Sequence, residues 1–192
     1  MKKEYVRTEV DLHNALIKKG WSILNDYVLL SGRDYKKVGF FGKRHLKKAI
    51  KLYHAALNIV PDNYSSKWAL GKIYQVLGNH NSSLKWFEEA WILENKNADI
   101  CREASLAAMN CGDFLKALKF CDKAIELQPD DAGLYCNKAL VMMFLNKDAE
   151  AIEAVAYSLK LRPNDQITLN LRKILYSMVD GNRTRPKSMK EI

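Results

Sequence analysis

The sequence has no run of apolar residues long enough to cross a bilayer, since a spanning helix needs about 20 of them in succession. It also has no secretory signal that we can recognise, because the basic residues 1–7 are not followed by an apolar segment. These two absences predict a cytoplasmic protein without a membrane span.

Cysteine is scarce, with 4 residues in a chain of 192. Cys101, Cys111, Cys121 and Cys136 form no Cys-x-x-Cys pair and fit no zinc-ligand spacing, so we expect small packing residues in a reducing compartment. The chain also lacks the GxxxxGK[ST], GxGxxG, HExxH and GxSxG motifs of nucleotide-binding proteins and hydrolases. We therefore expect no metal, no cofactor and no enzyme activity.

Proline is equally scarce, and its spacing is informative. Of the 4 prolines, Pro61 and Pro129 lie 68 residues apart, and Pro163 follows Pro129 by 34. Each of these three precedes Asp or Asn residues. Because proline cannot continue a helix and Asp or Asn caps the next one, the spacing predicts helix-to-helix junctions with a 34-residue period.

Small residues recur at fixed distances before these prolines. Ala49, Ala117 and Ala151 stand 12 residues before them. A second set of small residues stands 5 before them, at Ala56, Ala124 and Ser158. Residues seven apart share one face of a helix, so the pattern predicts helices that approach their neighbours closely.

The segment 64–97 carries the fullest version of the pattern. Its spaced residues are Leu70, Gly71, Tyr74, Gly78, Phe87 and Ala90. They resemble the tetratricopeptide repeat, a 34-residue helix pair with an aromatic residue, Leu-Gly, Tyr, Gly, Ala, Phe, Ala and Pro at fixed places. The sequence departs from that pattern at three places, because Trp68 stands one position late, Ser83 replaces an alanine and Asn95 replaces the proline.

The resemblance implies an all-α fold, a right-handed solenoid of about four helix-turn-helix repeats closed by a capping helix. We expect a partly helical extension at 1–17, the solenoid at 18–180 and a flexible basic tail at 181–192. The repeats are placed at about 18–63, 64–97, 98–131 and 132–165, and the capping helix at 166–180.

The first repeat is interrupted by an insertion near 33–44. Its first helix is expected to carry the signature spacing at Trp21 and Leu24 and to continue through Val28 to a turn at Gly32. Thr8 and Asp11 form the Thr-x-x-Asp pattern of a helix N-cap before it.

The resemblance also implies function, because such proteins commonly bind a peptide segment of a partner in a concave groove lined by the first helix of each repeat. By position, the lining residues of this chain are Trp68, Lys72, Gln75, Arg102, Leu106, Met109, Asn137, Leu140 and Met143. The alternative stays open that the apolar ones are core residues and that Trp68 packs inside its own repeat. We thus predict a scaffold or adaptor, and a homodimer also remains open.

One class of these proteins holds the tails of heat-shock chaperones with a clamp of Lys, Asn and Arg side chains. The corresponding positions here are Trp68 and Lys72, then Glu103, then Gly133 and Asn137. The clamp is largely absent, so chaperone tails are disfavoured as partners.

A basic segment lies at 33–51, with a net charge of +7. We assign a basic patch to Arg33, Lys36, Lys37, Lys43, Arg44, Lys47 and Lys48. Phe40 and Phe41 stand among them, and cations mixed with aromatic rings can bind nucleic acid or another anionic surface. Two other interpretations remain, an acidic protein partner and a solvated helix face with both phenylalanines tucked onto the solenoid.

Overall fold

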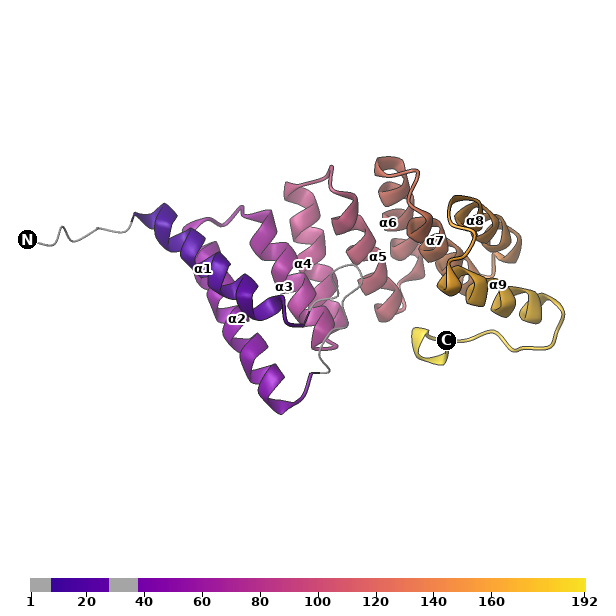
Figure 1. The fold of residues 1–192 in the computed structure, drawn as a ribbon, viewed down its shortest axis with the longest axis horizontal. Helices are drawn as coiled ribbons and strands as arrows, with labels where there is room; N and C mark the ends of the chain where they lie inside the picture. Colours follow the sequence, from indigo (N-terminus) through magenta and orange to yellow (C-terminus); the bar gives the residue numbers. More distant parts are fainter. Residues whose placement is uncertain (1–7, 28–37) are drawn as a thin grey trace, which may run out of the picture. The chain divides into compact units, whose positions relative to one another are not determined.

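The computed structural model describes residues 8–27 and 38–192. This part of the chain is helical and contains no strand, and Figure 1 labels its α-helices in chain order. The helices are α1 (Glu9–Leu24), α2 (Phe40–Ile59), α3 (Tyr64–Val76), α4 (His80–Leu93), α5 (Ala98–Cys111), α6 (Phe114–Leu127), α7 (Ala132–Phe144), α8 (Asp148–Leu161) and α9 (Gln166–Val179). A 3-10 helix, Met189–Glu191, follows near the end of the chain.

Short polar side chains start most of these helices, as the sequence predicts. Thr8 and Asp11 form a reciprocal capping box at α1. Asn63, Asp113 and Asp165 each accept a hydrogen bond from a backbone N–H of the first turn of α3, α6 and α9. The caps set where each helix begins, and thereby set the 34-residue period.

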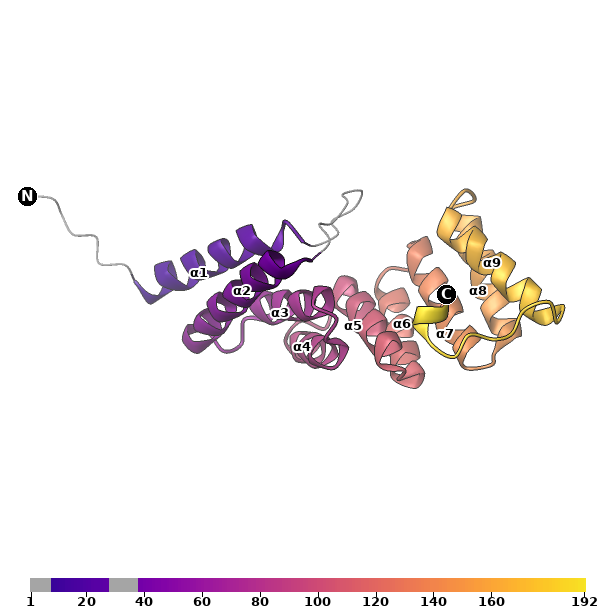
Figure 2. The ribbon, with the colours of Figure 1, turned by 90° about the horizontal axis from the view of Figure 1, so that it is seen from below.

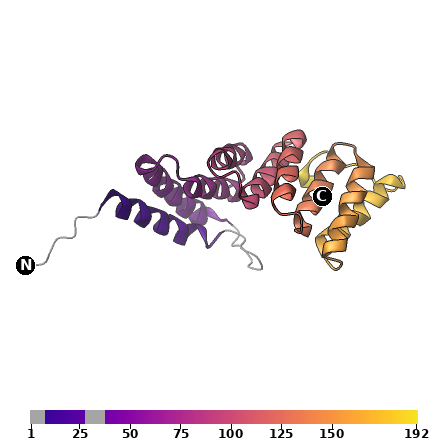
Figure 3. The same cartoon turned by 90° about the horizontal axis from the view of Figure 1, so that it is seen from above.

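The chain divides into two compact units, residues 1–94 and 95–192. In the first unit α1 packs against α2 and α3 against α4, and α3 also contacts both α1 and α2. Figure 3 shows α1 lying alongside α2. The core of this unit contains Leu24, Leu46, Ala49, Tyr53, Leu70 and Ile73.

A glycine lets the two helices of each pair in this unit come close. A Cβ atom on Gly71 of α3 would lie 2.6 Å from two ring carbons of Phe87 on α4, and one on Gly20 of α1 would lie 2.9 Å from the ring of Tyr53 on α2. Gly20 therefore occupies the place of Gly71, which puts the register of the first repeat earlier than the one predicted from Trp21 and Leu24.

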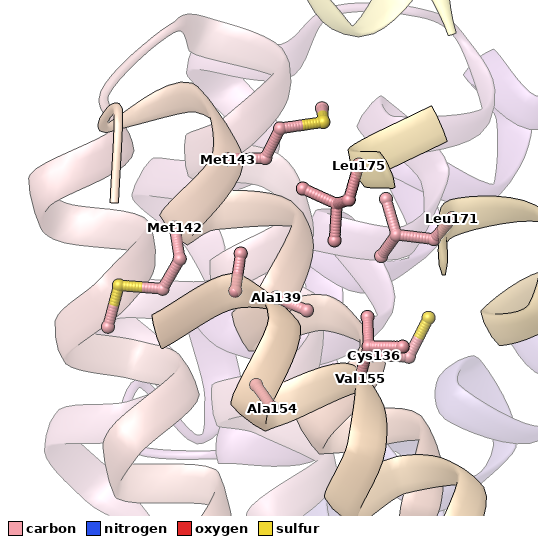
Figure 4. Packing of buried hydrophobic residues seen from close by; sticks show 9 residues of the cluster. Cys136, Ala139, Met142, Met143, Ala154, Val155, Leu171 and Leu175 are labelled. Atoms are coloured by element: carbon pink, nitrogen blue, oxygen red, sulfur yellow. The ribbon is translucent and has the colours of Figure 1, made fainter. Parts of the chain in front are cut away.

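The second unit contains α5 to α9. Within it α5 packs against α6 and α7 against α8, while α7 also contacts α5, α6 and α9. Figure 4 shows one core cluster, in which Leu171 and Leu175 of α9 point toward Met143 and Val155 of the preceding pair. The capping helix predicted at 166–180 thus covers the apolar side of the last repeat.

Serine at two predicted alanine positions is explained by buried hydrogen bonds. The Ser83 hydroxyl donates to the Gly71 carbonyl at 2.9 Å and joins α4 to α3. Ser158 likewise donates to the Ala132 carbonyl at 2.8 Å, and its oxygen lies 3.1 Å from Oγ1 of Thr168 on α9. A small side chain satisfies the packing at both sites and adds a link between helices.

Two expected boundaries differ from those of the structure. Residues 40–44, assigned to the insertion 33–44, form the first turn of α2 because its N-cap is Gly39. The expected limit between residues 17 and 18 falls inside α1, which is continuous from Glu9 to Leu24. Val28 and Gly32 lie outside the described residues.

The segment 181–192, expected to be a flexible tail, packs against the second unit. Arg185 donates to the carbonyl of Met143 and to Asp148, and Pro186 is buried. The segment is held because the planar guanidinium of Arg185 donates to two acceptors of the second unit at once.

Candidate functional site

The first helices α5 and α7 present equivalent leucines. Leu106 of α5 and Leu140 of α7 lie 34 residues apart, and both are half-buried. The two helices contact each other, and Leu140 packs on the core cluster below it with part of its surface still accessible. Asn137, one turn before Leu140, is half-buried as well. This face therefore offers apolar anchors next to a polar amide.

Met109 and Met143 do not belong to the accessible face. Their exposed fractions are 1% and 0%, so the prediction that they line a groove is wrong for the structure and the alternative of core residues holds. Both stand one turn after the leucines, at the C-terminal ends of α5 and α7. Met143 is covered by α9, as its contact with Leu175 in Figure 4 shows.

Arg102 of α5 is held between two carboxylates. Its guanidinium lies 2.6 Å from Oδ1 of Asp99 and 2.5 Å from Oδ2 of Asp131. The other oxygen of Asp131 accepts the backbone N–H of Gly133 at 2.8 Å, so the same side chain caps α7. Arg102 thus ties α5 to the start of α7, and its charge is compensated from within the unit.

The first unit places an aromatic pair on α1 and α3. The rings of Trp21 and Trp68 are 6.0 Å apart between centroids, and Trp21 is 37% exposed. The Lys72 ammonium lies 5.8 Å from the Trp68 ring centroid, although the lysine side chain is largely buried. Gln75 is half-buried one turn further along α3. Trp68 is therefore partly packed inside its unit and partly accessible.

The described residues include part of the basic patch. Arg33, Lys36 and Lys37 lie outside the described residues. Lys43, Arg44, Lys47 and Lys48 are exposed on α2, a helix whose sequence contains no Asp or Glu. Phe40 and Phe41, at 77% and 75% exposed, are not tucked onto the fold, so this part of the solvated-face interpretation is wrong. They form an edge-to-face pair with centroids 5.6 Å apart at the start of the cationic helix.

Burial makes Cys101 and Cys121 poor nucleophiles. It raises the pKa of Cys101 and of Cys121 to about 12, so both thiols remain protonated at neutral pH. In the described ranges no cluster of three or more His, Cys, Asp or Glu residues has the arrangement of a metal site. None of the described helices has the length and apolar character of a membrane span.

Two features of these surfaces are absent from the site residues that we predict from the sequence. Trp21 was assigned to the pattern of its own helix, and its pairing with Trp68 is hidden by the insertion that breaks the 34-residue spacing. Nothing in the sequence indicates the contact of Arg185, because it lies in a polar segment outside the repeats, where no spacing pattern applies.

Comparison with known proteins identifies the repeat. Residues 98–131 match the tetratricopeptide repeat family model, over the segment assigned to the third repeat from its spacing. The described chain also has the fold of tetratricopeptide-repeat proteins. A crystal structure of MamA is similar with a TM-score of 0.75 and 19% identity, over 91% of this chain and 85% of that one.

Two further solved structures concern peptide binding. YrrB, described as a tetratricopeptide-repeat protein with an unusual peptide-binding site, has a TM-score of 0.65 and 18% identity, over 74% of this chain and 73% of its own. The first such domain of Spaghetti (RPAP3), bound to an HSP90 peptide, has a TM-score of 0.58 and 17% identity, over 61% of this chain and 93% of its own. At these identities the likeness concerns the fold.

Proposed function

We propose that this chain, which has the tetratricopeptide-repeat fold, is a non-catalytic scaffold that binds a peptide segment of a protein partner on its first helices. The observation that carries the proposal is the pair Leu106 and Leu140. They occupy equivalent places on contacting helices, and each is half-buried, so that part of its apolar surface stays accessible. An apolar centre with a polar rim is typical of a protein–protein interface.

The chemistry of this face favours an apolar anchor on the partner. Arg102 beside it is already paired with Asp99 and Asp131, so its charge is not available for a peptide carboxylate. Separating Arg102 from these residues would leave the carboxylates of Asp99 and Asp131 without their counter-charge. This supports our view that chaperone tails, which are recognised through a terminal carboxylate, are not the ligand.

The first unit supports the same function through a different contact. Trp21 and Trp68 present two adjacent indole rings, with the Lys72 ammonium near one of them. Tryptophan is enriched in hot spots because it combines a large apolar area with a hydrogen-bond donor. We infer that this aromatic pair holds a second, apolar or aromatic part of a partner.

All four cysteines are free, which supports a role in a reducing compartment such as the cytoplasm.

The test starts from selection of a ligand from a random peptide library displayed on phage against the full chain. The affinity of the selected peptide is then measured by fluorescence anisotropy. We expect Leu106→Ala and Leu140→Ala each to weaken binding about tenfold, the effect of a moderate hot spot. Leu115→Ala is the matched control, because Leu115 is 67% exposed on the second helix α6. Equal affinities in all three variants would overturn the assignment to the first helices.

A second candidate function is binding of nucleic acid or another anionic surface through α2. The observation that favours it is a helix with exposed Lys43, Arg44, Lys47 and Lys48, no acidic residue and two exposed phenylalanines at its start. Binding through this face should weaken steeply with salt. Replacing the four cations with Glu should then abolish binding of single-stranded RNA and leave selected-peptide binding intact. Unchanged RNA binding would leave the helix face as solvated surface.

A further inference from the structure

The segment after α9 turns back over its own unit. The backbone N–H groups of Asn182 and Arg183 donate to the Ser177 carbonyl at 2.8 and 2.9 Å, which ends α9 and reverses the chain. Figure 2 shows the segment running from the end of α9 to lie beside α7. We call residues 181–192 the strap.

The strap contacts the second unit through an arginine at the α7–α8 turn. One guanidinium nitrogen of Arg185 donates to the Met143 carbonyl at the end of α7, and the other lies 2.6 Å from Oδ2 of Asp148, the first residue of α8. The Met143 carbonyl also accepts the backbone N–H of Asn146 at 3.2 Å, and it lies at a helix C-terminus, which carries partial negative charge. The turn therefore combines a carbonyl and a carboxylate at the spacing of a planar guanidinium fork.

The acceptor capacity of the turn is not used up. Oδ1 of Asp148 is buried and, among the described residues, has no hydrogen-bond partner. A buried carboxylate oxygen without a donor is unfavourable. A ligand that brings a second donor to Asp148 would satisfy it, which the strap does not do.

The strap is held at few points. Its remaining side-chain bonds, as far as the described chain shows, are internal: Glu191 accepts from the Lys187 backbone N–H at 2.9 Å and from the Ser188 hydroxyl at 3.2 Å. The Arg183 guanidinium lies 3.5 Å from the Glu191 carbonyl. Attachment to the unit thus depends on Arg185, whose side chain is 28% exposed, and on the buried Pro186. Such a contact can exchange.

We propose that the α7–α8 turn is a recognition site for an arginine side chain, occupied by the strap until an arginine-bearing segment of a partner displaces it. The inference rests on the proposed function in that it supposes a peptide partner. Its ligand class is different, however, because the turn selects a guanidinium and the leucine face selects an apolar anchor. While the strap occupies the turn, a competing segment cannot bind there. The apparent affinity for that segment is therefore the intrinsic affinity multiplied by the fraction of molecules in which the turn is open.

The experiment uses a fluorescent synthetic peptide with the sequence of residues 181–192 and the full chain. Binding is measured by anisotropy to the wild type, to Arg185→Ala, and to the control Arg183→Ala, which removes an arginine of the same segment that does not reach the turn. We expect Arg185→Ala to bind the peptide at least about fivefold more tightly than the wild type. In the wild type Arg185 occupies the turn in most molecules, and removing its side chain makes the turn available to the peptide. Arg183→Ala should match the wild type.

The acceptor is tested in the same background. Adding Asp148→Asn to Arg185→Ala should return the affinity to that of the wild type or below, and a peptide with Ala in place of Arg185 should not bind. The proposal is overturned if Arg185→Ala binds no more tightly than the wild type, if it shows no measurable binding, or if Asp148→Asn has no effect. Because the probe is the chain's own segment, none of these results depends on Leu106 or Leu140.

Discussion

Replacing Gly71 with alanine is expected to destabilise the first unit, although the same change usually stabilises a helix. In an exposed helix interior, alanine is favoured over glycine by about 1 kcal/mol. At Gly71 the added Cβ would lie 2.6 Å from two ring carbons of Phe87, well inside van der Waals contact. Phe87 is fully buried, so its ring cannot move aside without disturbing the core.

The magnitude follows from the balance of these two effects. Overpacking a well-filled core costs about 1–3 kcal/mol, and a clash with a buried ring belongs at the upper end or beyond it. After the propensity gain is subtracted, we expect a net loss of about 1–3 kcal/mol in the free energy of unfolding. For a unit of this size each kcal/mol lowers Tm by about 4–8 °C.

The assay is urea unfolding of the full chain, followed by far-UV circular dichroism. Gly39→Ala is the control, because its Cβ would meet no atom within 4 Å. Phe87→Leu in the Gly71→Ala background should recover part of the loss, since a smaller side chain leaves room for the methyl group, and the double-mutant cycle measures the coupling. A Gly71→Ala variant as stable as the wild type would refute the close approach of α3 and α4.

Other substitutions address the second unit. Ala124→Leu should destabilise more than Leu127→Ala in thermal melts, because Ala124 is fully buried and overpacking costs about 1–3 kcal/mol or more; the reverse order would contradict the assigned helix faces. Ser158→Ala should cost about 1–2 kcal/mol in urea unfolding, since it removes a buried hydrogen bond to the carbonyl that begins α7, and Ser158→Cys should not restore that loss. The hydroxyl and then the backbone N–H of Thr168 hold the pKa of Asp165 below its ordinary value. The stability from this cap is therefore present above the unfolded pKa of about 3.9 and is lost as the pH falls through the lower folded value. Thr168→Val should reduce that acid-limb dependence, and an unchanged pH profile would show that the cap contributes nothing.

The repeat architecture could be predicted because its determinants are local. Proline at 129 and 163 and the small residues before them fix where helices end and how closely they pack, and each signal lies within one repeat. The capping helix 166–180 followed from its amphipathic pattern for the same reason. The first repeat failed in register, because the insertion separates Gly20 from Tyr53 and no spacing within the sequence connects them.

The candidate surfaces could be predicted only in part. Position in the repeat identifies which helix a residue occupies, and it placed Leu106 and Leu140 on first helices, where both are half-buried. Position does not say how far a neighbouring helix extends over the end of that helix, so Met109 and Met143 were assigned to a groove although both are buried. The contact of Arg185 with Asp148 depends on the path of an aperiodic segment, which only the folded chain defines.

The most direct test of the scaffold function is amide hydrogen exchange, read by mass spectrometry, on the full chain with and without the phage-selected peptide. The account predicts that bound peptide slows exchange in α5 and α7, around Leu106 and Leu140, and leaves α6 and α8 unchanged. Protection confined to the second helices, or to the cationic α2, would contradict the claim that the first helices receive the partner.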